Sequence, residues 1–181
     1  MTTYIALLRG INVGGGKTLI KMERLREIFS KLGFENVRTY VNSGNVIFEA
    51  DGVPAKWNGK IEKAIAAEMK RPVSVIVRTG ADLKKIIAGN PFRKDKSVEP
   101  ARLLVMFLGG PAAKDAAKKF AAVDSGEDRY HFAGREIYLY CPDGVHESKF
   151  FRMDFDKVLG VSATGRNWNT VNKLCEMAGG S

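Results

Sequence analysis

The sequence predicts an α+β protein made of two ferredoxin-like βαββαβ plaits and an extra C-terminal helix. Two observations lead to this fold class: the order of apolar patterns in the first half, and the return of that order in the second half. Each half also contains a hairpin, whereas a doubly wound α/β sheet needs strands that alternate one for one with helices. The 181 residues suffice for two small domains.

The first half is expected to form a strand, a helix, a hairpin, a helix and a strand. Continuous apolar runs indicate buried strands, and apolar residues at intervals of three or four indicate helices, the first of which ends at Gly33. Ser43 and Gly44 give a two-residue turn signal between two strand patterns. The expected elements are a strand at 3–9, a helix from Met22 to Leu32, strands at NVRTYV and NVIFEA, a helix from Trp57 to Met69, and a strand at 72–77.

The second half repeats this order after a helix at ADLKKIIAG and a polar stretch that runs to Pro100. We therefore expect a first plait at 1–80, a helix and linker at 81–101, and a second plait with the extra helix at 102–181. The expected elements of the second plait are a strand at 103–108, a helix at 111–122, strands at RYHF and REIYLY, a helix at 149–160, a short strand at VSATG, and a final helix from about Trp168.

Composition and charge restrict the classes of partner. The formal net charge is +9 and the isoelectric point is near 9.6, which favours an anionic ligand or nucleic acid. The basic residues are spread along the chain, so a basic surface without a specific partner remains an equal interpretation. No apolar run is long enough for a membrane span, and the cytoplasm is the expected compartment. The oligomeric state stays open.

The sequence lacks the residue patterns that metal, redox and P-loop chemistry require. Cys141 and Cys175 show no metal or redox spacing, and with only two histidines no metal site or cofactor is expected. The stretch LLRGINVGGGKT at residues 7–18 invites comparison with a phosphate-binding P-loop. That loop needs four residues between its glycines and a helix that starts at the lysine. Here five residues separate Gly10 from Gly16, and the helical pattern begins near Lys21, so the P-loop interpretation fails.

Three blocks of the sequence resemble a bacterial family known as domain of unknown function 1697. These are LLRGINVGG, KMERLREIFSKLGFENVRTYVNSGNVIF and TGRNWNTVNKL, and the resemblance extends over essentially the whole chain. It implies a pair of α/β-plait subdomains, in agreement with the repeat described above. It implies no activity, because the family is named for lacking one. It also places Lys17 and Thr18 in a segment that varies within the family.

The first candidate site follows from topology. In a βαββαβ plait, the end of the first strand and the hairpin lie at the same edge of the sheet, and glycines there can form a concave anion nest. The candidate residues are Arg9, Asn12, Gly14, Gly15, Asn42, Ser43 and Asn45. The competing interpretation is structural, because tight turns use Gly and Asn and because Asn side chains often bond to their own backbone.

The second candidate site is the Arg166-Asn167-Trp168 block. Asn167 is expected to be the N-cap of the final helix, with Arg166 just outside it, and a helix N-terminus beside an arginine attracts phosphate or carboxylate. The structural alternative is that Trp168 anchors the helix while Asn167 caps it. A third candidate is the strand face carrying Tyr138 and Tyr140, which could stack on RNA bases, although packing within the protein is the favoured use.

The function expected from these features is a binding module for a phosphate-bearing ligand, either a nucleotide or an RNA backbone, at the loop–hairpin edge. An enzyme that uses the same edge is one alternative, with Tyr40 and Ser43 as participants in an unidentified reaction. The other is that the motifs only fasten the two plaits together.

Overall fold

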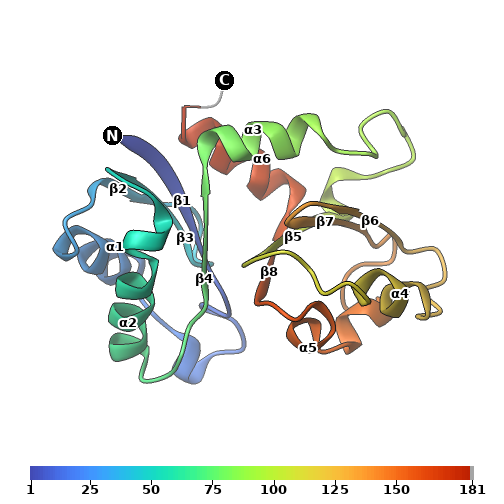
Figure 1. Cartoon of the computed structure of the whole chain (residues 1–181), viewed down its shortest axis with the longest axis horizontal. Coiled ribbons are helices and arrows are strands. Elements are labelled where there is room, and N and C mark those ends of the chain that lie inside the picture. Colours follow the sequence, from blue (N-terminus) through green and yellow to red (C-terminus); the bar gives the residue numbers. More distant parts are fainter. Residues whose placement is uncertain (180–181) are drawn as a thin grey trace. The chain divides into compact units, whose positions relative to one another are not determined.

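A computed structural model describes residues 1–179 and shows a mixed α+β protein (Figure 1). Its described residues form two four-stranded antiparallel sheets with the strand orders β2-β3-β1-β4 and β6-β7-β5-β8. Both orders are those of a ferredoxin-like plait, in which the first strand is central and pairs with the third and fourth. The predicted fold class and the repeated topology are therefore confirmed.

The chain divides into two compact units, which are Met1–Lys84 together with the residues from Leu174 onward, and Lys85–Lys173. The division falls inside two helices, α3 (Gly80–Ala88) and α6 (Trp168–Met177). The end of α6 belongs with the first unit because Gly80 packs closely on Ala178, where an added Cβ would lie 3.3 Å from the alanine methyl.

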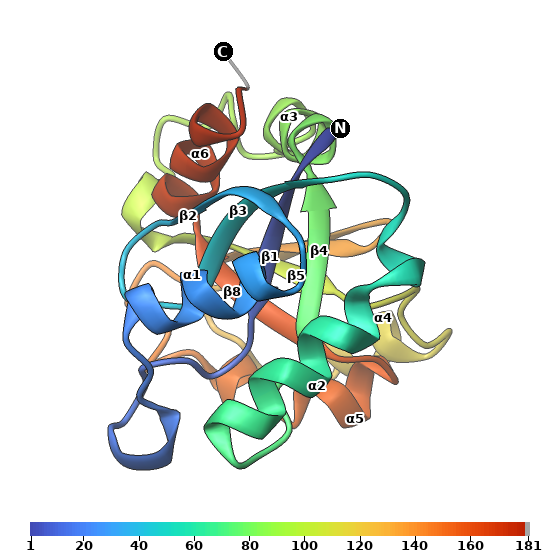
Figure 2. The same ribbon diagram turned by 90° about the vertical axis from the view of Figure 1, so that its left-hand side faces the viewer.

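The first unit packs two helices on one face of its sheet (Figure 2). Its elements are β1 (Thr2–Leu8), α1 (Met22–Lys31), β2 (Glu35–Thr39), β3 (Asn45–Ala50), α2 (Asn58–Met69) and β4 (Val75–Thr79). The core is strongly aromatic: Phe48 of β3 contacts Tyr4, Phe29, Phe34 and Trp57, with ring centroids 4.6–5.8 Å apart. Apolar burial of this kind is the main term that holds the sheet and its helices together.

The second unit repeats this arrangement with shorter helices. Its elements are β5 (Leu103–Leu108), α4 (Ala116–Ala121), β6 (Arg129–Ala133), β7 (Glu136–Tyr140), α5 (Phe155–Leu159) and β8 (Ala163–Asn167). Phe120 of α4 is fully buried and contacts Tyr130, Phe132, Phe150 and Phe155.

The helix expected over 149–160 is divided in two. A 3₁₀ turn occupies Lys149–Arg152, and α5 begins only at Phe155. The Asp154 side chain accepts a hydrogen bond from the Lys157 N–H, so this residue caps a new helix and does not continue the preceding turn.

Candidate functional site

Three connections of the first unit meet at one end of the strands of its sheet, where β1 ends and β3 and β4 begin. They are residues 9–21 between β1 and α1, residues 41–44 between β2 and β3, and residues 70–74 between α2 and β4. The Leu8 N–H donates to the Gly44 carbonyl at 2.9 Å, and the Arg9 N–H donates to the Ser74 carbonyl at 3.0 Å. We call these three segments together the loop edge. The structure thus brings the β1–α1 loop beside the hairpin, as the topology of the plait requires.

Asn12 is the residue that joins two of the three segments. Its Oδ1 accepts from the Ile20 N–H at 2.8 Å, and its Nδ2 donates to the Ile20 carbonyl at 3.0 Å and to Asn42 Oδ1 at 2.9 Å. Its backbone adopts a φ of 54°, a conformation that asparagine tolerates better than most residues. The side chain of Asn12 therefore shapes the loop.

The hairpin is closed differently from the expected two-residue turn. Tyr40 and Asn45 form the closing pair, because the Tyr40 N–H donates to the Asn45 carbonyl at 3.2 Å, and four residues, 41–44, make the loop. Asn45 is completely buried, and its Nδ2 donates to the Tyr40 carbonyl at 3.1 Å and to Ser43 Oγ at 3.0 Å. Asn45 thus supports the hairpin loop from the interior of the protein. The Ser43 hydroxyl receives a hydrogen bond from the Asn45 amide, whereas a nucleophilic serine would need a neighbouring general base.

Gly44 has a positive φ of 72° and lies directly against the β1–α1 loop. A Cβ added to Gly44 would be 3.0 Å from the Cβ of Ile11 and 3.1 Å from the Cβ of Leu8. Glycine is therefore required twice over at this position, by backbone conformation and by close approach. The contact fixes the hairpin on the loop.

Arg71 is a member of the loop edge that the sequence analysis missed. Its Nη2 donates to the Gly10 carbonyl at 2.6 Å, and its Nε lies 3.4 Å from the Lys17 carbonyl. The signal was present in the topology, because the α2–β4 connection of a plait lies at the same edge as the end of β1. Arg71 thus adds positive charge to the edge and ties the third segment to the first.

The tip of the β1–α1 loop presents backbone to solvent. Gly14, Gly15 and Gly16 are exposed and have φ values of 67°, 75° and 65°, and no atom lies within 4 Å of a Cβ built on them. Within residues 1–179 their N–H groups donate to no protein acceptor. Exposed N–H groups on successive residues can form a concave anion-binding nest.

Lys17 and Thr18 lie in a 3₁₀ turn, Gly16–Thr18, and α1 begins four residues later at Met22. The Thr18 hydroxyl contacts the carbonyls of Val13 at 2.5 Å and Gly15 at 3.0 Å. A P-loop threonine is instead needed for magnesium at the start of a helix. The geometry agrees with the sequence argument against a P-loop, and it leaves the exposed Lys17 side chain at the loop tip.

The charge of the loop edge has one sign. Its three segments carry five basic residues and no acidic residue, and the five are Arg9, Lys17, Lys21, Lys70 and Arg71. They are five of the 29 basic residues of the chain. A one-sign cluster beside open backbone N–H groups creates a field that attracts anions.

The Arg166-Asn167-Trp168 block is placed differently from the expectation. Arg166 lies inside β8, opposite Val105 of β5, and is only 9% exposed. Its Nη1 donates to Thr164 Oγ1 and to the Gly165 carbonyl, both at 2.8 Å, and burial lowers the pKa of its guanidinium to about 10. The strand expected at VSATG extends through Asn167, so Arg166 stands within the sheet and not in front of the helix.

Asn167 caps the final helix, as its sequence position indicates. Its Oδ1 accepts from the Asn169 N–H at 2.9 Å, and its Nδ2 donates to the Ala101 carbonyl at 3.0 Å. Trp168 follows as the first residue of α6, with its ring 6.5 Å from that of Tyr138. These contacts give Arg166, Asn167 and Trp168 structural roles, and their use as ligand contacts stays a prediction.

The aromatic face of β7 is occupied by the protein itself. Tyr138 and Tyr140 are buried, and their hydroxyls donate to the carbonyls of Ile86 at 2.6 Å and Ser97 at 3.1 Å. The segment that precedes β5 therefore covers both rings. The packing interpretation holds for this face, and base stacking on it would require that segment to leave.

Within the described residues, no group of three or more His, Cys, Asp or Glu side chains could hold a metal ion. Over the same residues, no helix has the length and hydropathy needed to cross a bilayer.

Comparison with known proteins assigns the chain to a family. Residues 1–138 match the model of the family described as "Protein of unknown function (DUF1697)", and the chain belongs to that family. Among solved structures, it is similar to the conserved bacterial protein SP0830 from Streptococcus pneumoniae, with a TM-score of 0.80, 23% sequence identity and 98% of each chain covered. This likeness shows a shared fold. No curated protein matches the sequence.

Proposed function

We propose that the loop edge of the first unit binds a phosphate-bearing ligand, such as a nucleotide or the backbone of an RNA. The observation that carries the proposal is that the three segments of the loop edge hold five basic residues and no acidic one, together with three exposed glycines at the tip of the β1–α1 loop. Phosphate oxygens accept hydrogen bonds from backbone N–H groups and from lysine and arginine side chains, and both kinds of donor are present here.

The contacts of the loop edge divide the residues into two roles. Asn12, Asn45 and Arg71 use their side chains on the protein's own backbone, so they shape the edge. Direct contacts with the ligand fall to the N–H groups of Gly14–Gly16 and to the exposed ammonium group of Lys17. Replacing Asn12, Asn45 or Arg71 would therefore change the shape of the loop edge as well as ligand binding. Replacing Lys17 removes one ammonium contact with the ligand and keeps the hydrogen bonds that shape the loop.

The experiment measures the affinity for sodium pyrophosphate, ATP and a short oligouridylate by calorimetry. Lys17→Ala should weaken binding of at least one of these probes by roughly threefold to tenfold, the loss of one charge contact near the surface. Lys60→Ala is the matched control, because it removes the same charge from the first turn of α2, at the opposite edge of the sheet.

Equal losses in the two variants would mean that the net charge alone attracts the anions, and the proposal would then fail. The three probes also separate the ligand classes. An RNA ligand should lose affinity steeply as salt rises, because several phosphate contacts release counterions together, whereas pyrophosphate should lose far less.

A further inference from the structure

The second unit contains a cavity of about 410 Å³ between the segment 87–100 and the start of α6. Its apolar lining includes Ile87, Val98, Leu103 and Trp168, and its polar lining consists of Asn90, Arg93 and Asp95. A volume of this size suits a small molecule, and a lining that combines apolar side chains with a few polar groups is typical of ligand sites. The loop edge of the proposed function has no part in this cavity.

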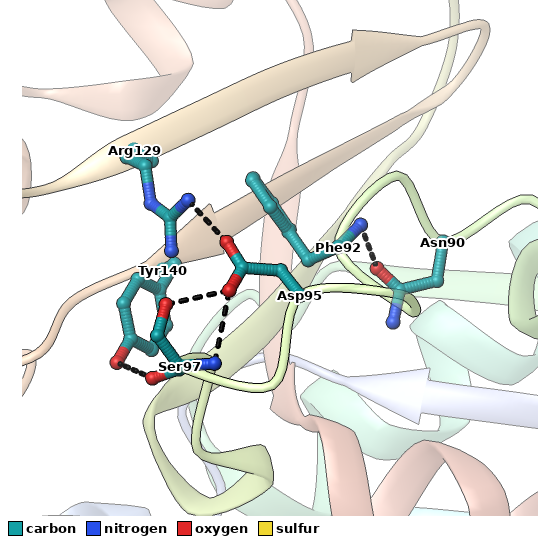
Figure 3. A network of polar contacts seen from close by, with 6 residues as sticks. All are labelled: Asn90, Phe92, Asp95, Ser97, Arg129 and Tyr140. Atoms are coloured by element: carbon teal, nitrogen blue, oxygen red, sulfur yellow. Dashed lines mark hydrogen bonds and ion pairs between the residues drawn. The ribbon is translucent and has the colours of Figure 1, made fainter.

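The segment that forms one side of the cavity is held rigidly on the sheet (Figure 3). The Arg129 guanidinium lies over the rings of Phe92 and Tyr140, at 5.2 and 5.0 Å from their centroids, and its Nη1 contacts Asp95 Oδ2 at 2.8 Å. The other carboxylate oxygen of Asp95 accepts from the N–H and the hydroxyl of Ser97. A cavity built on such a frame exists before a ligand arrives, which lowers the entropy cost of binding.

Asn90 is the polar group that remains incompletely used. Its side chain is 7% exposed, and its Oδ1 accepts from the Phe92 N–H at 2.9 Å. That bond fixes the amide with Nδ2 turned away from Phe92 (Figure 3). Across residues 1–179, Nδ2 donates to no protein acceptor. Nδ2 itself reaches solvent, so a ligand that supplies an acceptor oxygen there would replace a water molecule on an amide donor that the protein does not use.

We propose that this cavity binds a small planar ring that carries a carbonyl oxygen, as in a nucleobase or an aromatic carboxamide. The carbonyl oxygen accepts from Asn90 Nδ2, and the ring packs against the indole of Trp168. Of the three polar residues on the lining, Asp95 is paired with Arg129 and Arg93 lies 3.4 Å from the Ala88 carbonyl, which leaves the Asn90 amide as the donor for a carbonyl oxygen. The ring is favoured over an aliphatic chain because Phe92 and Trp168 offer aromatic surface on the lining.

The test titrates the ¹⁵N-labelled chain with nicotinamide, with uracil and with pyridine, and follows the indole N–H signal of Trp168 by NMR. Nicotinamide and pyridine share the ring, but only nicotinamide has the carbonyl oxygen. We expect saturable shifts with nicotinamide or uracil at a dissociation constant of about 1 mM, and affinity for pyridine at least about tenfold weaker. No saturable shift with either carbonyl probe, or equal affinity for nicotinamide and pyridine, would overturn the proposal.

A variant then assigns the contact to Asn90. Asn90→Asp keeps the oxygen that accepts from Phe92 and removes the donor, so affinity for the carbonyl probe should fall at least about tenfold while pyridine binding stays unchanged. Asn169→Asp is the control, since it adds the same charge on an exposed side chain next to Trp168. The assigned contact would be contradicted if Asn169→Asp lost as much affinity for the carbonyl probe as Asn90→Asp is expected to lose, or if Asn90→Asp lost none. The comparison of nicotinamide with pyridine uses the wild-type protein, so it remains a test even if Asn90→Asp folds poorly.

Discussion

The carboxamide of Asn12 spans two loops of the first unit: it exchanges a pair of hydrogen bonds with the backbone of Ile20 and donates to Asn42 Oδ1 at 2.9 Å. In this way one side chain closes the β1–α1 loop and ties it to the hairpin. Asparagine suits the position because its amide reproduces a peptide group and because it tolerates the φ of 54°. The loop edge is thus organised before any ligand is present.

Replacing Asn12 should destabilise the first unit. Asn12→Ala removes three hydrogen bonds and places alanine in the left-handed region, so we expect a loss of roughly 2–3 kcal/mol in the free energy of unfolding. Asn12→Gly loses the same hydrogen bonds without the backbone strain and should lose about 1 kcal/mol less. Urea denaturation measures both values, and equal stability of the two variants would show that the strain is absent.

The approach of Gly44 to Ile11 makes a second prediction. Gly44→Ala should lose roughly 2–4 kcal/mol of stability, because the new methyl group would clash with Ile11 and Leu8 and the backbone would be strained. Gly14→Ala has a similar φ but open space around the new methyl, so strain alone applies and the loss should be about 1–2 kcal/mol. Chemical denaturation of both variants should show the larger loss at Gly44; the reverse order would refute the contact.

Asp95 should make stability depend on pH in the acid range. Its hydrogen bonds from Ser97, followed by those from Arg129, lower the pKa of the carboxyl to about 2. A lowered pKa in the folded state gives a stabilisation that is complete above the unfolded pKa of about 3.9 and is lost as pH falls through about 2. The urea midpoint of the wild type should therefore approach that of Asp95→Asn as pH falls from 5 to about 2. A constant difference across this range would argue against the ion pair.

Tyr138 and Tyr140 offer a test of the covered sheet face. Tyr138→Phe leaves the Ile86 carbonyl without its donor in a buried place, and we expect a loss of about 1–2 kcal/mol. Tyr140→Phe removes a longer bond to the less buried Ser97 carbonyl and should lose less. Thermal unfolding compares the two, and a stability unchanged by Tyr138→Phe would mean that the segment before β5 does not rest on this ring.

The fold could be predicted from sequence because the apolar patterns encode it. The periods of the strands and helices indicated the order of the elements, and the topology of a plait then placed the loop that contains Asn12 beside the hairpin that contains Asn42. The strand expected at 161–165 lies two residues later, at Ala163–Asn167, and has Gly165 at its centre. The structure explains this glycine: an added Cβ would be 2.8 Å from the sulfur of Met106 on β5.

The candidate site could be located from sequence, but its contacts could not. Arg71 donates to the carbonyls of Gly10 and Lys17. Every residue has a backbone carbonyl, so the sequence does not indicate which of them a side chain will contact. The four-residue hairpin loop depends on the buried amide of Asn45, which the Ser43-Gly44 turn signal concealed. Arg166 looked like a ligand group in front of a helix because the pairing of β8 with β5 is a long-range contact.

The most direct measurement of the central claim is the backbone amide spectrum of the ¹⁵N-labelled chain during titration with pyrophosphate. Binding at the loop edge predicts saturable shifts concentrated on Gly14, Gly15 and Gly16, reduced in Lys17→Ala and retained in Lys60→Ala. Amide signals of these three glycines that stay unmoved while shifts scatter over basic residues elsewhere would contradict the account.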